Sequence, residues 1–191
     1  MRLDELYDFE AAAVLENLER QREALASLKP QILRAGELLR GALATDNKAL
    51  FFGNGGSAAD AQHWAAELSG RYARERRGLA GLALTTDTSA ITAIANDYGY
   101  ERVFERQVEA LAKPGDVAIG ISTSGHSANV LAALRKAKEM GCKTIAVLGR
   151  DGGGIAPLAG VAIVYNAKET PRIQEFHAVI GHLLCALVDA P

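Results

Sequence analysis

Two patterns of hydrophobic and polar residues divide the chain near position 45. Before that point, apolar residues recur at the three- and four-residue spacing of an amphipathic helix, as at Leu3, Leu6, Phe9, Val14, Leu15 and Leu18. The pattern predicts a helix up to about Leu28 and a second helix from Pro30 to about Thr45, because proline is favoured in the first helical turn. We interpret residues 1–45 as an N-terminal helical hairpin that is a candidate oligomer element.

Beyond position 45, strand-length apolar runs alternate with helical patterns. The runs are residues 49–52, 79–84, 117–121, 144–148 and 161–164, and several are continuous, as in buried parallel strands. The helical patterns are residues 57–71, 89–96, 101–111, 127–139 and 171–188, with one further turn at 156–159. This order predicts a single α/β domain whose core, residues 46–191, is a five-stranded parallel sheet flanked by helices, of the doubly wound, flavodoxin-like type.

Composition narrows the class of protein. With 191 residues, 49% of them apolar, the chain can bury a sizeable core. Lys and Arg total 21 and Asp and Glu total 23, which argues against binding nucleic acid through bulk charge. We interpret the one basic cluster, Arg71, Arg74, Arg76 and Arg77, as a solvated turn.

The chain also lacks the features of a membrane or exported protein. No apolar run approaches the ~20 residues of a membrane span, and the first residues carry no apolar core of a signal peptide. Cys142 and Cys185 have no metal-binding or redox spacing, so we expect buried, reduced thiols. These observations favour a cytoplasmic protein.

The segment after the third predicted strand is the clearest functional signal. Residues 122–127 read Ser-Thr-Ser-Gly-His-Ser and lead into a helix. Small hydroxyl side chains and the free N–H groups of a helix start together suit a phosphate, and Gly125 permits close backbone approach. An ordinary helix cap at Ser127 would leave Ser122, Thr123 and Ser124 unexplained. No lysine follows in the spacing of a nucleoside triphosphatase loop.

A second glycine-rich turn follows the first predicted strand. It reads Gly53-Asn54-Gly55-Gly56-Ser57 and opens a helix, but it lacks the full dinucleotide-binding spacing. The carboxyl ends of parallel strands form the ligand crevice of such sheets. Two such loops at one edge therefore favour a shared ligand site.

Histidine and acidic side chains supply candidate chemistry. His63 and Glu67 are four residues apart on one helix face, where they could share a divalent metal or form a surface pair. Gln174 and His182 on the last helix are eight residues apart, about 12 Å along an ideal helix. They could reach one ion with stretched side chains or serve different copies of the site.

These stretches resemble a known family. Asn54-Gly-Gly-Ser-Ala-Ala-Asp-Ala-Gln-His63, Leu84-Thr-Thr-Asp-Thr-Ser, Ala95-Asn-Asp97, Ser122-Thr-Ser-Gly and Arg172-Ile-Gln-Glu175 are similar to the phosphoheptose isomerases of the sugar isomerase (SIS) domain group, over nearly the whole chain. The resemblance implies one SIS domain and conversion of sedoheptulose 7-phosphate to D-glycero-D-manno-heptose 7-phosphate. It also implies a homotetramer with sites at subunit interfaces and one zinc ion per subunit.

The resemblance also implies site residues. The metal ligands would be His63, Glu67, Gln174 and His182. The substrate-binding residues would be Asn54, Gly55, Gly56, Ser57, Glu67, Arg71, Asn96, Asp97, Ser122, Thr123, Ser124, Ser127 and Gln174. His126 receives no role. Because the reaction moves a proton between C1 and C2 through an enediol(ate), we assign Glu67 as the base at carbon and His182 as its acid/base partner at oxygen.

Two other functions remain open at this point. Close SIS relatives bind the bacterial replication initiator without catalysis, and others sense sugar phosphates in transcription regulators. The first group lacks the equivalents of Glu67 and His182, which this chain keeps. The second group usually carries a DNA-binding domain, which is not visible here. The enzyme is therefore favoured.

Overall fold

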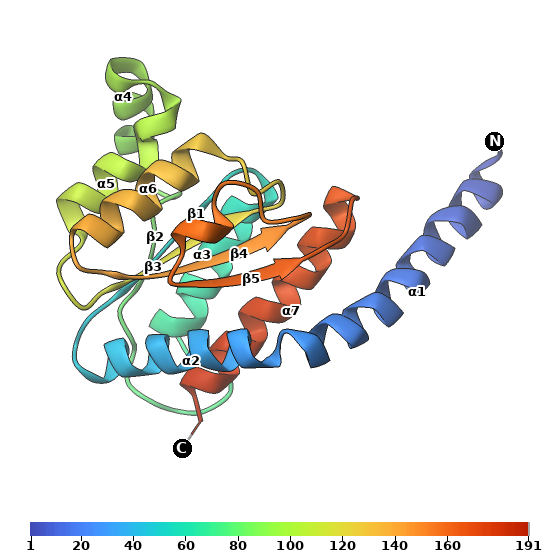
Figure 1. The fold of residues 1–191 in the computed structure, drawn as a ribbon, viewed down its shortest axis with the longest axis horizontal. Coiled ribbons are helices and arrows are strands. Elements are labelled where there is room, and N and C mark those ends of the chain that lie inside the picture. Colours follow the sequence, from blue (N-terminus) through green and yellow to red (C-terminus); the bar gives the residue numbers. More distant parts are fainter. Residues whose placement is uncertain (191) are drawn as a thin grey trace.

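A fully parallel sheet forms the middle layer of the structure, a computed structural model that describes residues 1–190 (Figure 1). Its strands are β1 (Ala49–Gly53), β2 (Gly81–Ala83), β3 (Val117–Ser122), β4 (Lys143–Gly149) and β5 (Val161–Tyr165). Their order, β2-β1-β3-β4-β5, is that of a flavodoxin-like doubly wound sheet, so the predicted fold class is confirmed. Only β2 is much shorter than predicted, because it is an edge strand that pairs with β1 over three residues.

Helices cover both faces of the sheet (Figure 1). One face packs against α2 (Lys29–Ala44), α3 (Gly56–Ser69) and α7 (Thr170–Val188), and the other against α5 (Val103–Leu111) and α6 (Ala128–Glu139). Neighbouring residues of β1 show the alternation: Phe51 meets Trp64 of α3 edge-on at 6.2 Å, and Phe52 meets Phe104 of α5 at 5.7 Å. Burial on both faces explains why the strands read as continuous apolar runs.

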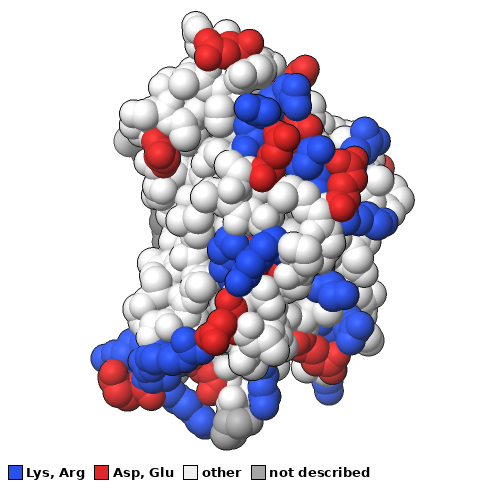
Figure 2. All heavy atoms as spheres, turned by 90° about the vertical axis from the view of Figure 1, so that its left-hand side faces the viewer, with Lys and Arg blue, Asp and Glu red and all other residues white. Residues whose placement is uncertain are grey.

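Three smaller elements complete the fold. The α4 helix (Thr88–Tyr98) leads into a 3₁₀ turn (Tyr100–Arg102), and a second 3₁₀ turn (Ala156–Leu158) precedes β5. Cys142 and Cys185 are buried and unpaired, as expected. Among residues 1–190, no helix has both the length and the apolar character to cross a bilayer. On the face shown in Figure 2, cationic and anionic side chains are interspersed, in keeping with the balanced composition.

The two N-terminal helices are present, but they do not fold back as a hairpin. The α1 helix (Leu3–Ser27) is separated from α2 by Leu28 alone, and in Figure 1 it continues outward from α2, away from the sheet. A one-residue connection cannot reverse the chain, and Pro30 in the first turn of α2 produces a bend instead. Only Asn17 and Gln21 of α1 are buried in this chain.

Candidate active site

The segment between β3 and α6 gathers the predicted phosphate-binding hydroxyls. Ser122 Oγ lies 2.9 Å from Ser127 Oγ and 3.4 Å from Ser124 Oγ, and it accepts a hydrogen bond from the Gly125 amide at 3.1 Å. Ser127 occupies the N-cap of α6, yet its side chain does not cap the helix. The hydroxyls therefore form a cluster at a helix start, which suits an anion better than a simple cap would.

The loop that follows β4 packs against this cluster. Gly125 has a φ of +70°, and a Cβ there would lie 2.3 Å from the Gly152 carbonyl carbon. The Ile155 amide donates to the Gly125 carbonyl at 3.1 Å. Backbone therefore packs directly on backbone, which fixes the shape of the loop at residues 122–127 and requires glycine at position 125.

The glycine-rich turn after β1 lies beside the start of α6. The side chains of Asn54 and Asn129 exchange two hydrogen bonds, and the Tyr100 hydroxyl donates to Asn54 Oδ1 at 3.1 Å. Gly55 has a φ of +57° and, like Gly56, is exposed. Ser57 is buried against Gly53, below the surface of the turn. Tyr100 and Asn129 belong to this site although no local motif pointed to them.

Three candidate metal ligands come together farther along α3. His63 Nε2 lies 3.2 Å from Glu67 Oε1, and the His182 ring meets the His63 ring edge-on with centroids 5.0 Å apart. One ligand atom from each of the three residues lies within 4.8 Å of the others. Two imidazoles and a carboxylate fit Zn²⁺, and three protein ligands leave a position for substrate or water.

Gln174 lies at a different point of the same helix pair. A Cβ at Gly56 would be 2.1 Å from Gln174 Nε2, so this side chain covers the first turn of α3. His63 is seven residues later in α3, a rise of about 10 Å. Within one chain, Gln174 therefore borders the glycine-rich turn rather than the cluster of His63, Glu67 and His182.

The remaining predicted substrate-binding residues are at the surface. Asn96 Nδ2 donates to Asp97 Oδ1 at 2.8 Å near the end of α4, and both residues are exposed. Among the described residues no hydrogen bond joins them to the loop at residues 122–127, although Tyr100 reaches Asn54. Arg71 is exposed, 3.8 Å from Glu75. Thr123 is half-buried within the loop at residues 122–127.

The two helices that carry the candidate metal ligands also hold two titratable groups, the half-buried Asp60 on α3 and the fully buried His177 on α7. Burial raises the pKa of Asp60 to about 6, while nearby His63 acts in the opposite direction. One carboxylate oxygen of Asp60 is buried without a partner among residues 1–190. His177 is buried under the sheet, and burial lowers its pKa to about 4. Asp60 was missed by sequence reasoning, although it lies within the motif that ends at His63.

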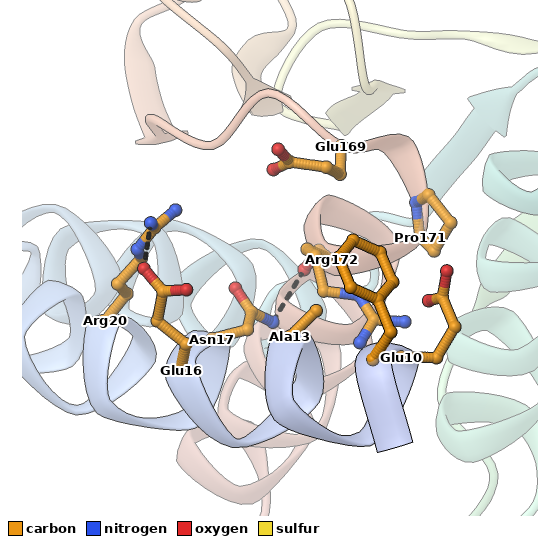
Figure 3. Close-up of a pocket in the computed structure, with 9 residues that line it drawn as sticks. Glu10, Ala13, Glu16, Asn17, Arg20, Glu169, Pro171 and Arg172 are labelled. Atoms are coloured by element: carbon orange, nitrogen blue, oxygen red, sulfur yellow. Dashed lines mark hydrogen bonds and ion pairs between the residues drawn. The ribbon is translucent and has the colours of Figure 1, made fainter. Parts of the chain in front are cut away.

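A separate cavity of about 330 Å³ lies between α1 and the start of α7 (Figure 3). Buried Asn17 donates to the Arg172 carbonyl at 3.3 Å and to Glu175 Oε2 at 3.0 Å, and its Oδ1 accepts from the Tyr165 hydroxyl at 2.5 Å. Asn17 thereby fastens α1 to the turn of α7 that carries Gln174.

Comparisons with known proteins show the family and the fold. The SIS domain family model matches residues 11–149. The chain is 54% identical to the phosphoheptose isomerase of Aliarcobacter butzleri over 178 residues, covering 93% of this chain and 89% of that protein. It is 59% identical to that of Geotalea daltonii over 162 residues, or 85% and 84% of the two chains. The structure of phosphoheptose isomerase GmhA from Neisseria gonorrhoeae matches with a TM-score of 0.90 and 46% identity, covering 96% and 98% of the two chains.

Proposed function

The chain belongs to the phosphoheptose isomerase family of SIS domain proteins, and on that premise we propose that it isomerises D-sedoheptulose 7-phosphate to D-glycero-D-manno-heptose 7-phosphate. This is the first step towards an activated heptose. The observation that carries the proposal is the clustering of His63, Glu67 and His182 within 4.8 Å in a fold that also presents the hydroxyl loop after β3.

The loop after β3 would hold the phosphate, which is remote from the reacting carbons and supplies binding energy and register. The hydroxyl cluster and the start of α6 support this role. We propose that the substrate contacts Asn54, Gly55, Gly56, Ser57, Glu67, Arg71, Asn96, Asp97, Ser122, Thr123, Ser124, Ser127 and Gln174.

The proton transfers fall to two side chains. Glu67 would take the proton from C1 and return it at C2, and His182 would serve the oxygens of the enediol(ate) as acid and base. Glu67 and His182 lie in one cluster and their side chains are partly exposed, so a substrate can reach both. His177, which is also on α7, is fully buried.

His63, Glu67, Gln174 and His182 would hold one zinc ion per subunit. Bound zinc polarises a carbonyl and stabilises an enediolate. Because Gln174 lies two turns of α3 from the other three ligands, the full set requires Gln174 to move or to come from a second copy. A carboxylate that is tightly bound to a metal is a poor base, so Glu67 would act as the base only while it is not a ligand.

A tetramer with sites at subunit interfaces is part of the same proposal. The side chains of Leu3, Tyr7 and Leu18 on α1 are more than half exposed and lie on one side of the helix, and α1 extends away from the sheet (Figure 1). Exposed apolar side chains in such a stripe mark an interaction surface. The free thiols of Cys142 and Cys185 are compatible with a reducing compartment such as the cytoplasm.

The proposal is tested by following conversion of sedoheptulose 7-phosphate by the purified protein before chelation, after chelation, and after zinc is returned. We expect turnover that chelation lowers and zinc restores. A protein that never converts the sugar phosphate in any of the three states would contradict the enzyme function. A metal-free protein with an undiminished rate would remove the metal role of His63.

A further inference from the structure

The segment that joins α3 to β2, residues 70–80, contains no helix or strand. Arg71, Arg74 and Arg77 are exposed there, as expected for a solvated turn. Arg76 departs from that interpretation, because its side chain is only 17% exposed and its partner Asp189 is 4% exposed. The segment is therefore anchored at one arginine.

Arg76 closes the carboxyl end of α3. Its Nη2 donates to the Glu67 carbonyl at 2.9 Å, and its Nη1 donates to the carbonyls of Leu68 at 2.9 Å and Gly70 at 3.3 Å. The last carbonyls of a helix lack helical partners and carry a partial negative charge, so a buried guanidinium suits them. One of these carbonyls belongs to Glu67, the proposed base.

Asp189, just past the end of α7, fixes both Arg76 and the segment backbone. Its Oδ1 accepts from Arg76 Nε at 2.6 Å, and its Oδ2 accepts from the amides of Ala73 at 3.0 Å and Arg74 at 3.2 Å. Asp189 thus holds the backbone that directly follows Tyr72, while α7 itself carries His182 about two turns earlier.

The Tyr72 ring lies over His182 as a result. The ring centroids are 5.9 Å apart and the rings are inclined by 31°, with Tyr72 half-buried. The His182 ring also meets the His63 ring edge-on. His182 therefore contacts both a proposed metal ligand and a tyrosine that has no part in the proposed chemistry.

We propose that Tyr72 is a positioning residue that sets the orientation of the His182 imidazole, and that the Arg76–Asp189 ion pair holds Tyr72 in place. This inference rests on the proposed function, in which His182 is both a metal ligand and an acid/base group. The side chain of Tyr72 acts through its ring, so the hydroxyl is dispensable. Groups that orient metal ligands typically change metal affinity or activity by about 10- to 100-fold when removed.

The test measures zinc affinity of the apo protein by competition with a chromophoric chelator, alongside kcat and thermal unfolding. Tyr72→Leu removes the ring, Tyr72→Phe keeps it, and Arg76→Lys breaks the carbonyl contacts. Arg77→Lys is the matched control, because Arg77 lies in the same segment but pairs with the exposed Asp46. We expect about tenfold weaker zinc binding and lower kcat in Tyr72→Leu and Arg76→Lys, and values close to those of the unaltered protein in Tyr72→Phe and Arg77→Lys.

Unchanged zinc affinity and kcat in Tyr72→Leu would overturn the inference, even if its unfolding temperature fell, because that pattern describes a purely structural side chain. If Arg76→Lys does not fold, Tyr72→Leu decides alone. If the unaltered protein is active but binds no zinc, the metal part of the proposed function fails, and kcat in Tyr72→Leu against Tyr72→Phe judges the inference. An unaltered protein without activity or zinc binding would contradict both.

Discussion

The side-chain amides of Asn54 and Asn129 pair reciprocally, with Nδ2 to Oδ1 distances of 2.9 Å and 2.8 Å. This pair joins the turn after β1 to the first turn of α6, and so ties together the two loops that the sequence singled out. It lies where the order of the sheet reverses, between β1 and β3, the usual ligand crevice of such folds.

Breaking the amide pair should separate the two loops. In Asn129→Leu, both hydrogen bonds to Asn54 are lost. The half-buried side-chain amide of Asn54 then keeps only its hydrogen bond from the Tyr100 hydroxyl. We expect unfolding free energy to fall by about 1–3 kcal/mol. We also expect KM to rise about tenfold, the change that 1.4 kcal/mol of lost positioning produces. Urea unfolding and steady-state kinetics measure the two effects; an unchanged KM would show that the pair does not position the substrate loops.

Gly125→Ala should deform the loop after β3, which is proposed to bind the phosphate. The added methyl group would meet the Gly152 carbonyl carbon at 2.3 Å, and the φ of +70° is unfavourable for alanine. Strain of this kind costs about 1–3 kcal/mol, and here it should appear as a higher KM with zinc affinity unchanged. Gly41→Ala is the control, because that helical position has open space and should gain up to about 1 kcal/mol of stability.

The proposed acid/base pair predicts a different kinetic signature. Glu67→Gln and His182→Gln should each lower kcat by about 10²- to 10⁴-fold while the circular dichroism spectrum stays unchanged. Gln62→Ala, at an exposed position of the same helix, should leave kcat unaltered. Full turnover in either of the first two variants would refute the assignment.

The stability of the protein in acid should depend on Asp116, which directly precedes β3 at the amino ends of the strands. Its buried carboxylate accepts from Lys48 Nζ at 2.6 Å, from the Lys48 amide at 2.9 Å and from the Lys113 amide at 2.8 Å. Burial acts to raise the pKa of Asp116, but these hydrogen bonds outweigh burial and leave the pKa below its ordinary value.

Because the folded-state pKa is depressed, the contribution of Asp116 is complete above the unfolded-state pKa of about 3.9 and is lost as pH falls through the folded-state pKa. We expect Asp116→Asn to be about 1–3 kcal/mol less stable at pH 7, with the difference shrinking below about pH 4. Urea unfolding at several pH values measures this, with Asp46→Asn as an exposed control. A difference that stays constant down to pH 3 would exclude this role.

The strands were predicted well because a strand that is buried on both faces of a sheet appears in the sequence as a continuous apolar run. The run at 117–121 and β3 differ by one residue, since every residue of that strand is buried. The run at 79–84 overshot β2, whose length is set by its pairing with β1 and not by its own apolar residues. The bend at Leu28 follows from a connection of one residue, and apolar periodicity alone does not fix the length of a connection, so it could not separate a bend from a hairpin.

The site residues also fall into two groups, those in contiguous motifs and those brought together only by the fold. The hydroxyl loop and the glycine-rich turn are contiguous and were visible as motifs. Other contacts join residues that are far apart in the chain, so the spacing of residues in the sequence could not predict them. These are the contacts of Tyr100 with Asn54, of Tyr72 with His182 and of Arg76 with Asp189. The ideal-helix distance between Gln174 and His182 agrees with the structure, in which the two side chains lie beside different turns of α3.

Proton transfer by Glu67 can be followed in the conversion of sedoheptulose 7-phosphate by the zinc-loaded protein in D₂O, with the product examined for deuterium at C2. Proton transfer through an enediol(ate) by Glu67 passes the hydrogen through a group that exchanges with solvent. We expect heptose 7-phosphate that carries deuterium at C2. Product formed with only protium at C2, or no product at all, would contradict this expectation.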